Sequence, residues 1–240
     1  MTVKRYGIHF NGLHSVHDLG ILTLESKSIG IPNKKKVTVQ VPFSNEVYDF
    51  STVYGGQLYD QRQLVYNFKI KNRLHGSKEA MNMEKINILN WLFGTTGYTK
   101  LVDDAIPGYY FLAEVQGNTS FEEEWAHGVL KVTFTAYPFK IAEKAEGDDI
   151  WDDFNFELDV FQATEFDVDG TLTTTIVNPS ISLARPEITA SSDFTVILNN
   201  TEHTIKRGTA TYDYFTFDKI NTVTIKGKGH ISFKWFKELI

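Results

Sequence analysis

The 240-residue sequence contains no cysteine, so disulfide bonds, thiolate nucleophiles and thiolate metal ligands are excluded. It also has no apolar run near the roughly 18 residues that a membrane-spanning helix needs. The first residues, Met1–Tyr6, are not followed by the apolar segment of a signal peptide. These absences are typical of a protein that folds in a reducing cytoplasm and does not enter a membrane.

An excess of basic charge is absent as well. The formal net charge is −6, whereas proteins that bind nucleic acids or membrane surfaces usually carry a basic patch. The acidity is local, because residues 143–169 contain eleven Asp and Glu against the single Lys144, while the segments on either side are slightly basic. With 42% apolar and 14% aromatic residues, the chain can form a substantial core, and the acidic segment marks where one domain closes and another opens.

The motifs of common catalytic sites are lacking too. No Gly-x-Gly-x-x-Gly, phosphate-binding loop or Gly-x-Ser-x-Gly occurs, and these motifs hold dinucleotides, phosphates and serine nucleophiles. The doublets Asp103-Asp104 and Asp148-Asp149 do not form a catalytic pair by themselves, because neighbouring residues of a strand point to opposite faces. We therefore expect no enzyme activity and no cofactor.

Two groups of residues match metal sites only in part. His14 and His17 lie close in sequence, but zinc needs a third or fourth ligand and no spaced His or Cys supplies one. Residues 165–170, Glu-Phe-Asp-Val-Asp-Gly, match the first positions of a calcium loop, but Ile176 stands where the loop needs a bidentate Glu. We interpret the histidines as structural or surface residues and the Asp-Gly pair as a hairpin turn, and we predict no metal site.

Most of the remaining pattern is that of β-strands. In residues 128–139, Leu130, Val132 and Phe134 alternate with polar residues, which indicates a half-buried strand. This strand should end at Tyr137-Pro138, because proline cannot donate to a sheet ladder. Further strands are predicted at residues 3–10, 36–43, 64–70, 109–115, 154–158, 172–177, 194–198, 222–226 and 231–235. Turns are predicted at Asn11-Gly12, Asp169-Gly170, Asn199-Asn200 and Gly227–Gly229.

Only one segment has the pattern of a helix. Ser77 is a suitable N-cap, Glu79 in the first turn favours the helix dipole, and Gly94 is a natural stop. The apolar residues between them that fall near one face are Met81, Ile88, Leu89 and Leu92. We predict that this stripe packs on a sheet, with a groove for a partner protein as the less favoured interpretation.

Several short elements occur in a fixed order along the chain. They are Tyr6…Phe10-Asn11-Gly12 followed by Asp18–Ile21, Val39–Pro42 before an aromatic loop, Tyr59…Arg62…Phe68, a single helix ending near Trp91-Leu92, and a last strand Leu130–Phe134 that closes in Tyr137-Pro138. Together they resemble the distal tail (Dit) proteins of siphophages that infect Gram-positive bacteria. One departure is Phe43, which follows Val41-Pro42 where many relatives have Gly.

The resemblance implies a mainly β protein of two domains. The first, residues 1–141, would be a ring-forming, β-sandwich-like belt with one α-helix and a β-hairpin. The second, residues 142–240, would be a galectin-like β-sandwich. The protein would be a virion structural component at the phage tail tip, synthesised in the cytoplasm of the bacterial host.

The resemblance also implies partners. The protein would form a homohexamer, as one ring or two stacked rings, between the tail tube or tape measure protein and the tail-associated lysin or receptor-binding protein, where it anchors host-adhesion proteins. Residues 44–61 are rich in Tyr and Phe, which suit protein interfaces. We predict that four of these aromatic residues lie at or near the subunit contact, the alternative being that they cover the domain's own core. They are Tyr48, Phe50, Tyr54 and Tyr59.

A carbohydrate-binding module is the alternative function. In that case the C-terminal sandwich would recognise host cell-wall polysaccharide by stacking sugars on aromatic faces. The candidate platform residues are Trp151, Tyr212, Tyr214 and Trp235. A hydrolase is a third and weaker alternative, because no acid/base pair is visible.

Overall fold

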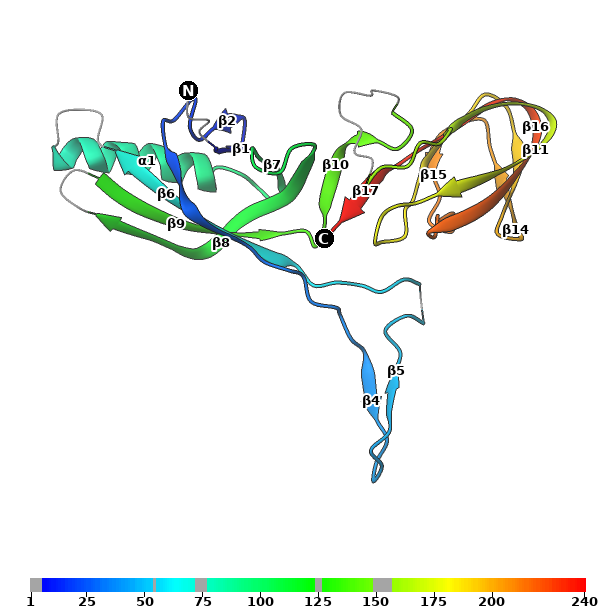
Figure 1. The fold of residues 1–240 in the computed structure, drawn as a ribbon, viewed down its shortest axis with the longest axis horizontal. Helices are drawn as coiled ribbons and strands as arrows, with labels where there is room; N and C mark the ends of the chain where they lie inside the picture. Colours follow the sequence, from blue (N-terminus) through cyan, green and yellow to red (C-terminus); the bar gives the residue numbers. More distant parts are fainter. Residues whose placement is uncertain (1–5, 54, 72–76, 124–126, 149–156) are drawn as a thin grey trace. The chain divides into compact units, whose positions relative to one another are not determined.

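The computed structural model describes residues 6–53, 55–71, 77–123, 127–148 and 157–240. Over these residues the protein is mainly β, with antiparallel sheets and one helix (Figure 1), as the alternating pattern predicted. The chain falls into two compact units, the first running to Lys140 and the second from Ile141 to Leu239. That these units are the ring-forming and galectin-like domains stays a prediction. Among the described helices, none has the length and apolarity to span a membrane.

The first unit is built on an antiparallel sheet with the strand order β2-β1-β7-β8-β9-β6-β3. Its strands are β1 (Ile8–Phe10), β2 (Leu13–His14), β3 (Leu22–Ile29), β6 (Arg62–Lys71), β7 (Thr99–Asp103), β8 (Tyr109–Glu123) and β9 (His127–Ala136). β6 and β9 pair over their whole length, from Arg62 opposite Ala136 to Lys71 opposite His127. β9 ends just before Tyr137-Pro138, as predicted.

Alternation decides which side chains of these central strands are buried. Leu64, Tyr66 and Phe68 of β6 and Val132 and Phe134 of β9 all lie in one core cluster. The Phe134 ring packs edge-on against Tyr66 with a centroid distance of 5.9 Å. Residues two apart on a strand share a face, so the period-two pattern located this core correctly.

The helix α1 (Lys78–Phe93) covers this core. Its N-cap is Ser77, whose side chain accepts a hydrogen bond from the Ala80 N–H, and its C-cap is Gly94, so both predicted helix ends are confirmed. The Trp91 indole N–H donates to the Phe10 carbonyl at 2.7 Å. The buried residues of the helix are Met81, Ile88, Trp91 and Leu92. The predicted packing of this face on the sheet is confirmed, although Leu89 is only partly buried.

The second unit contains an antiparallel sheet with the order β14-β13-β16-β12-β15, in which β11 also pairs with β16. Its strands are β11 (Glu165–Val177), β12 (Glu187–Ala190), β13 (Phe194–Leu198), β14 (Thr201–Ile205), β15 (Gly208–Thr211) and β16 (Ile220–Lys234). A further pair joins β10 (Lys140–Ala145) to β17 (Phe236–Leu239). The predicted strand at 154–158 falls largely outside the described residues.

Two predicted turns of this unit are wrong. Asp169-Gly170 lies inside β11, and Gly227–Gly229 lies inside β16, so each strand continues through its glycines. Gly170 pairs with Gly227, and their φ angles of +100° and +150° belong to glycine. Paired glycines at such angles bend two long strands together instead of reversing the chain. β16 can then pair with β13 before the bend and with β12 after it.

The predicted turns Asn11-Gly12 and Asn199-Asn200 are confirmed. In each turn both residues have positive φ angles, +45° and +76° in the first and +46° and +71° in the second. This is the backbone of a type I′ hairpin turn, which matches the twist of the flanking strands. The first turn joins β1 to β2 and the second joins β13 to β14.

Candidate protein interface

The candidate site is a β-hairpin of the first unit, residues 30–61 between β3 and β6, which we call the arm (Figure 1). Its strands β4 (Thr38–Gln40) and β5 (Val47–Asp49) form a two-stranded sheet of their own. The predicted strand at 36–43 is therefore shorter than expected. Residues 44–61, which were expected to form an aromatic loop, contain the returning strand of the hairpin.

The root of the arm is fixed by Arg62, which is buried. Its Nε donates to the Gly30 carbonyl at 2.7 Å, and its guanidinium also donates to the Pro138 carbonyl at 3.2 Å. Gly30 itself donates to the Gln63 carbonyl, and a Cβ at Gly30 would lie 2.6 Å from that oxygen. Only glycine allows so close an approach of the two backbones, so the arm begins at a defined point.

Backbone and side-chain hydrogen bonds join the two halves of the arm above this root. The Lys35 N–H donates to the Leu58 carbonyl at 2.8 Å, and the Gln57 amide donates to the carbonyls of both residues. Further out, Lys36 donates to the Asp49 carboxylate at 2.6 Å, which lowers the pKa of Asp49. Both of these charged side chains are about half exposed, so this ion pair contributes little to stability.

The tip of the arm is a tight turn. The Ser44 N–H donates to the Val41 carbonyl at 3.2 Å, with Pro42 and Phe43 between them, and Phe43 has a φ of +58°. Proline followed by a residue of positive φ is the arrangement of a type II turn. The expected Gly position is therefore occupied by Phe43 in the backbone conformation that favours Gly.

The arm exposes an unusual amount of apolar surface. Among the described residues of the chain, its exposed large apolar side chains are Ile31, Val37, Val39, Phe43, Val47, Tyr48, Phe50, Val53 and Leu58. An isolated two-stranded hairpin is at best marginally stable in water. An exposed apolar surface on such an element is typical of a segment that binds another protein.

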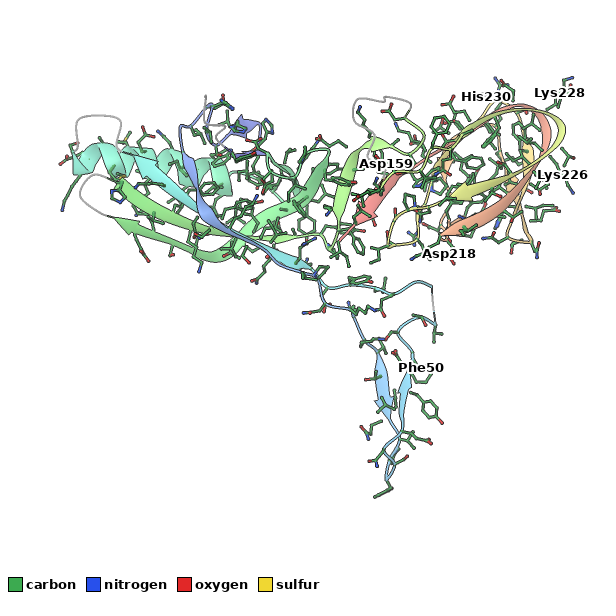
Figure 2. All side chains as sticks on the ribbon, viewed as in Figure 1. Phe50, Asp159, Asp218, Lys226, Lys228 and His230 are labelled. Carbon is green, nitrogen blue, oxygen red and sulfur yellow. The ribbon has the colours of Figure 1, made fainter. Side chains whose placement is uncertain are left out.

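The four predicted contact residues differ in their surroundings. Tyr48 and Phe50 lie on or next to β5 with exposures of 57% and 47%, and Figure 2 shows the Phe50 side chain on the arm. Tyr59 is partly buried, and its ring packs edge-on against Phe139 of the same unit at 5.2 Å. Tyr54 lies outside the described residues. A role in a subunit contact stays a prediction for all four.

Sequence reasoning missed the aliphatic part of this surface. Val37 and Val39 alternate with polar residues, which predicted a strand at 36–43, and the structure exposes both side chains. Alternation assigns residues to faces, and it does not show whether any layer covers the face. The sequence signal for this surface was Phe43 after Pro42, because an aromatic residue at a turn position that favours glycine indicates a function for the side chain.

The His14 ring has a structural role and His17 is exposed, which fits the interpretation of the pair as structural or surface residues. The ring Nδ1 of His14 accepts hydrogen bonds from the backbone N–H groups of Val16 and His17, so its Nε2 is the donor to Asp104 at 3.1 Å. Both ring nitrogens of His14 are therefore engaged in holding the loop that follows β2. Among the described residues, no group of three or more His, Cys, Asp or Glu is placed to hold a metal ion.

The calcium-loop-like residues are part of a charge ladder on the surface. Across the β11–β16 pair, Asp167 contacts His230 at 2.9 Å and Asp169 contacts Lys228 at 3.2 Å. Figure 2 shows both basic residues on β16. Each acid therefore faces a base of the neighbouring strand. This segment is part of a strand and not a turn, and its acids serve cross-strand pairing.

Among the described aromatic residues considered for sugar stacking, the Tyr212 and Tyr214 rings lie together with centroids 5.4 Å apart, and Trp235 lies in the core. Trp235 is 3% exposed and belongs to the core of the second unit, which contradicts a role as a platform. Tyr212 is partly buried, and Tyr214 stacks on the His203 ring at 5.4 Å. Trp151 lies outside the described residues. The Tyr212 and Tyr214 rings are tilted by 46° to each other, and Tyr214 alone of the three described candidates is well exposed.

The second unit contains a buried charge cluster. Lys237 is 2% exposed and donates to the Asp159 carboxylate and to the Leu158 carbonyl. Glu146, the residue that follows β10, the strand paired with that of Lys237, is also buried. Burial, together with the Asp159 charge, raises the pKa of Glu146 to about 7, although Lys237 and a hydrogen bond from Gln162 oppose the shift. The cluster ties residues 158–162 to β17.

This cluster predicts a pH-dependent stability. Because the folded pKa of Glu146 exceeds its usual value of 4.5, the contribution of this group to stability is full below pH 4.5 and is lost as the pH rises through about 7. The loss amounts to about 3 kcal/mol. Glu146→Gln should remove it, as measured by urea unfolding of the full chain at pH 5 and pH 8. Glu143→Gln, an exposed carboxylate of β10, is the control, and an unchanged pH dependence in Glu146→Gln would refute the assignment.

Comparison with known proteins identifies the fold. No protein-family model matches the chain, and no curated protein matches it in sequence. In structure it is similar to the SPP1 Dit (gp 19.1) protein, a hub adsorption protein of Gram-positive infecting phages, with a TM-score of 0.66 and 10% identity over 99% of this chain and 100% of that chain. A chain of the activated phage p2 baseplate gives a TM-score of 0.39 and 11% identity over 98% and 97% of the two chains. The resemblance to distal tail proteins is confirmed at the level of the fold.

Proposed function

We propose that this protein is a structural component of a siphophage tail tip and acts there as a distal tail protein. The observation that carries the proposal is the fold shared with the SPP1 Dit protein over nearly the whole of both chains. The exposed apolar arm of the first unit also supports the proposal, because proteins that assemble bury apolar surface in their contacts. The protein would occupy the virion tail tip after synthesis in the host cytoplasm, and it would not be an enzyme.

The proposed assembly is a ring of six copies formed through the first unit. The arm of one copy would pack on the next copy, in a head-to-tail contact that closes into a ring when the rotation is right. The ring would lie between the tail tube or tape measure protein and the tail-associated lysin or receptor-binding protein. Through the second unit it would anchor the proteins that adhere to the host.

The arm has enough apolar surface to drive such a contact. Fully burying one side chain of this kind contributes roughly 1.5–3 kcal/mol. Four or five of them would offset the roughly 4–15 kcal/mol that association costs in lost freedom. Since the arm exposes nine such side chains, a subset of them is sufficient.

The experiment that tests the proposal is the solution mass of the purified protein, measured by light scattering at several concentrations. Six copies of the 27.4 kDa chain give about 164 kDa, and we expect this species to grow with concentration. A single 27.4 kDa species at every concentration would contradict a ring that forms through this chain alone.

A carbohydrate-binding function is not adopted in its place, because the burial of Trp235 removes one of its platform residues. Titration with host cell-wall polysaccharide, followed by Trp fluorescence, separates the two functions. A scaffold gives no saturable change, whereas a saturable change would restore the sugar-binding alternative.

A further inference from the structure

The tip of the arm holds an aromatic residue in an unfavourable backbone conformation. Phe43 has a φ of +58° in a turn whose first central residue is Pro42. A bulky residue rarely adopts positive φ, because its Cβ crowds the backbone, whereas glycine does so freely. Strain of this kind is kept mainly where it serves binding.

The strain at Phe43 is not offset by burial of its side chain within its own chain. It is fully exposed, and its ring has no aromatic partner among the described residues. The turn itself would be relaxed by glycine. An exposed aromatic ring at a strained position is therefore placed to fill a pocket on another molecule.

A second unpartnered apolar surface of the first unit lies on α1. Met83, Ile86 and Phe93 are exposed, and their spacing of three and seven residues places them on one side of the helix. The buried residues Met81 and Ile88 fall on the opposite side. We call Met83, Ile86 and Phe93 the outer stripe.

The exposed residues that border the outer stripe are Asn82, Asn87, Asn90 and, one turn before Met83, Glu79. The outer stripe therefore has one charged neighbour. Helices of globular proteins usually carry one apolar face, so a second apolar stripe is typical of a surface that another protein covers. It is also compact, because its three members lie within three turns of one helix.

A closed ring requires two different surfaces on each copy, one that docks and one that receives. The arm is the docking surface. We propose that its tip, anchored by Phe43, packs on the outer stripe of α1 of a second copy of this chain. The inference rests on the proposed function and names both halves of the subunit contact.

The competing receiving surface lies on the second unit. Leu158, Ile181 and Leu183 are exposed there, but they lie beside charged residues. The Asp159 carboxylate next to Leu158 accepts from Lys237, and the Glu238 carboxylate accepts from Ser182, which lies between Ile181 and Leu183. An apolar tip would desolvate these two carboxylates, so it favours the outer stripe, which has Glu79 as its one charged neighbour.

The anchor is tested by Phe43→Gly and Phe43→Leu, measured by light scattering over a concentration series. Phe43→Gly relaxes the turn and removes the ring, so it should leave the fold intact and weaken assembly by about 30-fold, the effect of losing one anchoring aromatic residue. Phe43→Leu keeps an apolar side chain and should retain more of the affinity. Assembly of Phe43→Gly at the wild-type concentration would overturn the proposal.

The receiving surface is tested by cross-linking, for which the absence of cysteine gives a clean background. Asn45→Cys at the tip and Asn87→Cys beside the outer stripe are made in separate copies that carry different mass tags. The two copies are mixed and treated with a short bis-maleimide. A mixed dimer is expected, while Asn45→Cys with Thr171→Cys on the surface of β11 should give none.

Failure of this inference is distinguishable from failure of the proposed function. If the wild type does not assemble, the ring itself is contradicted. In a second outcome, the wild type assembles while Asn45→Cys cross-links to Leu183→Cys and not to Asn87→Cys. That result would support the ring and exclude the outer stripe as its receiving surface. Absence of any mixed dimer in an assembling protein excludes it as well.

Discussion

Replacement of residues 36–57 by the two-residue turn Asn-Gly is expected to give a folded protein that stays monomeric where the wild type assembles. The Lys35 N–H donates to the Leu58 carbonyl at 2.8 Å, so these two residues are close enough to be joined by a short hairpin turn. The change removes Phe43, Tyr48 and Phe50 together with the aliphatic residues around them. We expect affinity between copies to fall by at least about 10³-fold, because more than 4 kcal/mol of apolar contact is lost.

The fold should survive this truncation. None of the residues replaced belongs to the core cluster of the first unit, and β4 and β5 pair only with each other. Tyr59 and its packing on Phe139 are retained, as are the hydrogen bonds of Arg62 at the root. Circular dichroism and the melting temperature should therefore match those of the wild type.

A matched pair of variants separates the side chains of the arm from its backbone. Tyr48→Ala with Phe50→Ala keeps the hairpin and should weaken assembly in part. Tyr59→Ala removes a ring that packs within the unit and should lower the melting temperature. A truncated chain that assembles with wild-type affinity would contradict the role of the arm.

The parts of the fold that could be predicted from the sequence are those set by local patterns. The alternation in β6 and β9, the Asn-Gly turn and the Ser77 and Gly94 ends of the helix each depend on a few neighbouring residues. Such signals act through dihedral preference and through faces that are fixed by periodicity. They need no knowledge of the partner strand.

The errors arise where a distant partner decides the outcome. Gly227 and Gly229 were predicted as a turn, but Gly170, which lies far away in sequence, pairs with Gly227 and continues the ladder through the bend. The arm shows the same limit in another form. Val37 and Val39 have the pattern of a buried face, and whether a layer covers them depends on tertiary or quaternary structure. Phe43 was the residue at which the local rule failed, and it is also the residue that we propose as an anchor.

A second large effect is expected in the core of the first unit, where Asp103 is 2% exposed. Its carboxylate accepts hydrogen bonds from the Lys27 ammonium at 2.7 and 2.9 Å, from the Tyr66 hydroxyl at 2.8 Å and from the Ala105 N–H at 2.9 Å. Burial and the adjacent Asp103 charge raise the pKa of Tyr66, so this phenol stays protonated and remains a donor. The carboxylate therefore joins β7 to β3 and β6, which do not lie next to β7 in the sheet.

Asp103→Ala should lower the free energy of unfolding by about 3–5 kcal/mol, because it leaves a partly buried ammonium and a buried hydroxyl without their acceptor. Asp103→Asn keeps one acceptor oxygen and should cost less, and Tyr66→Phe removes a single hydrogen bond and should cost about 1–2 kcal/mol. Hydrogen exchange of peptides from β6 and β7, measured in the full chain, gives the loss of stability of the first unit in each of the three variants. The order Ala, then Asn, then Phe follows from the number of donors left unpaired. Equal losses in all three variants would mean that the Tyr66 hydrogen bond alone accounts for the stability of this site.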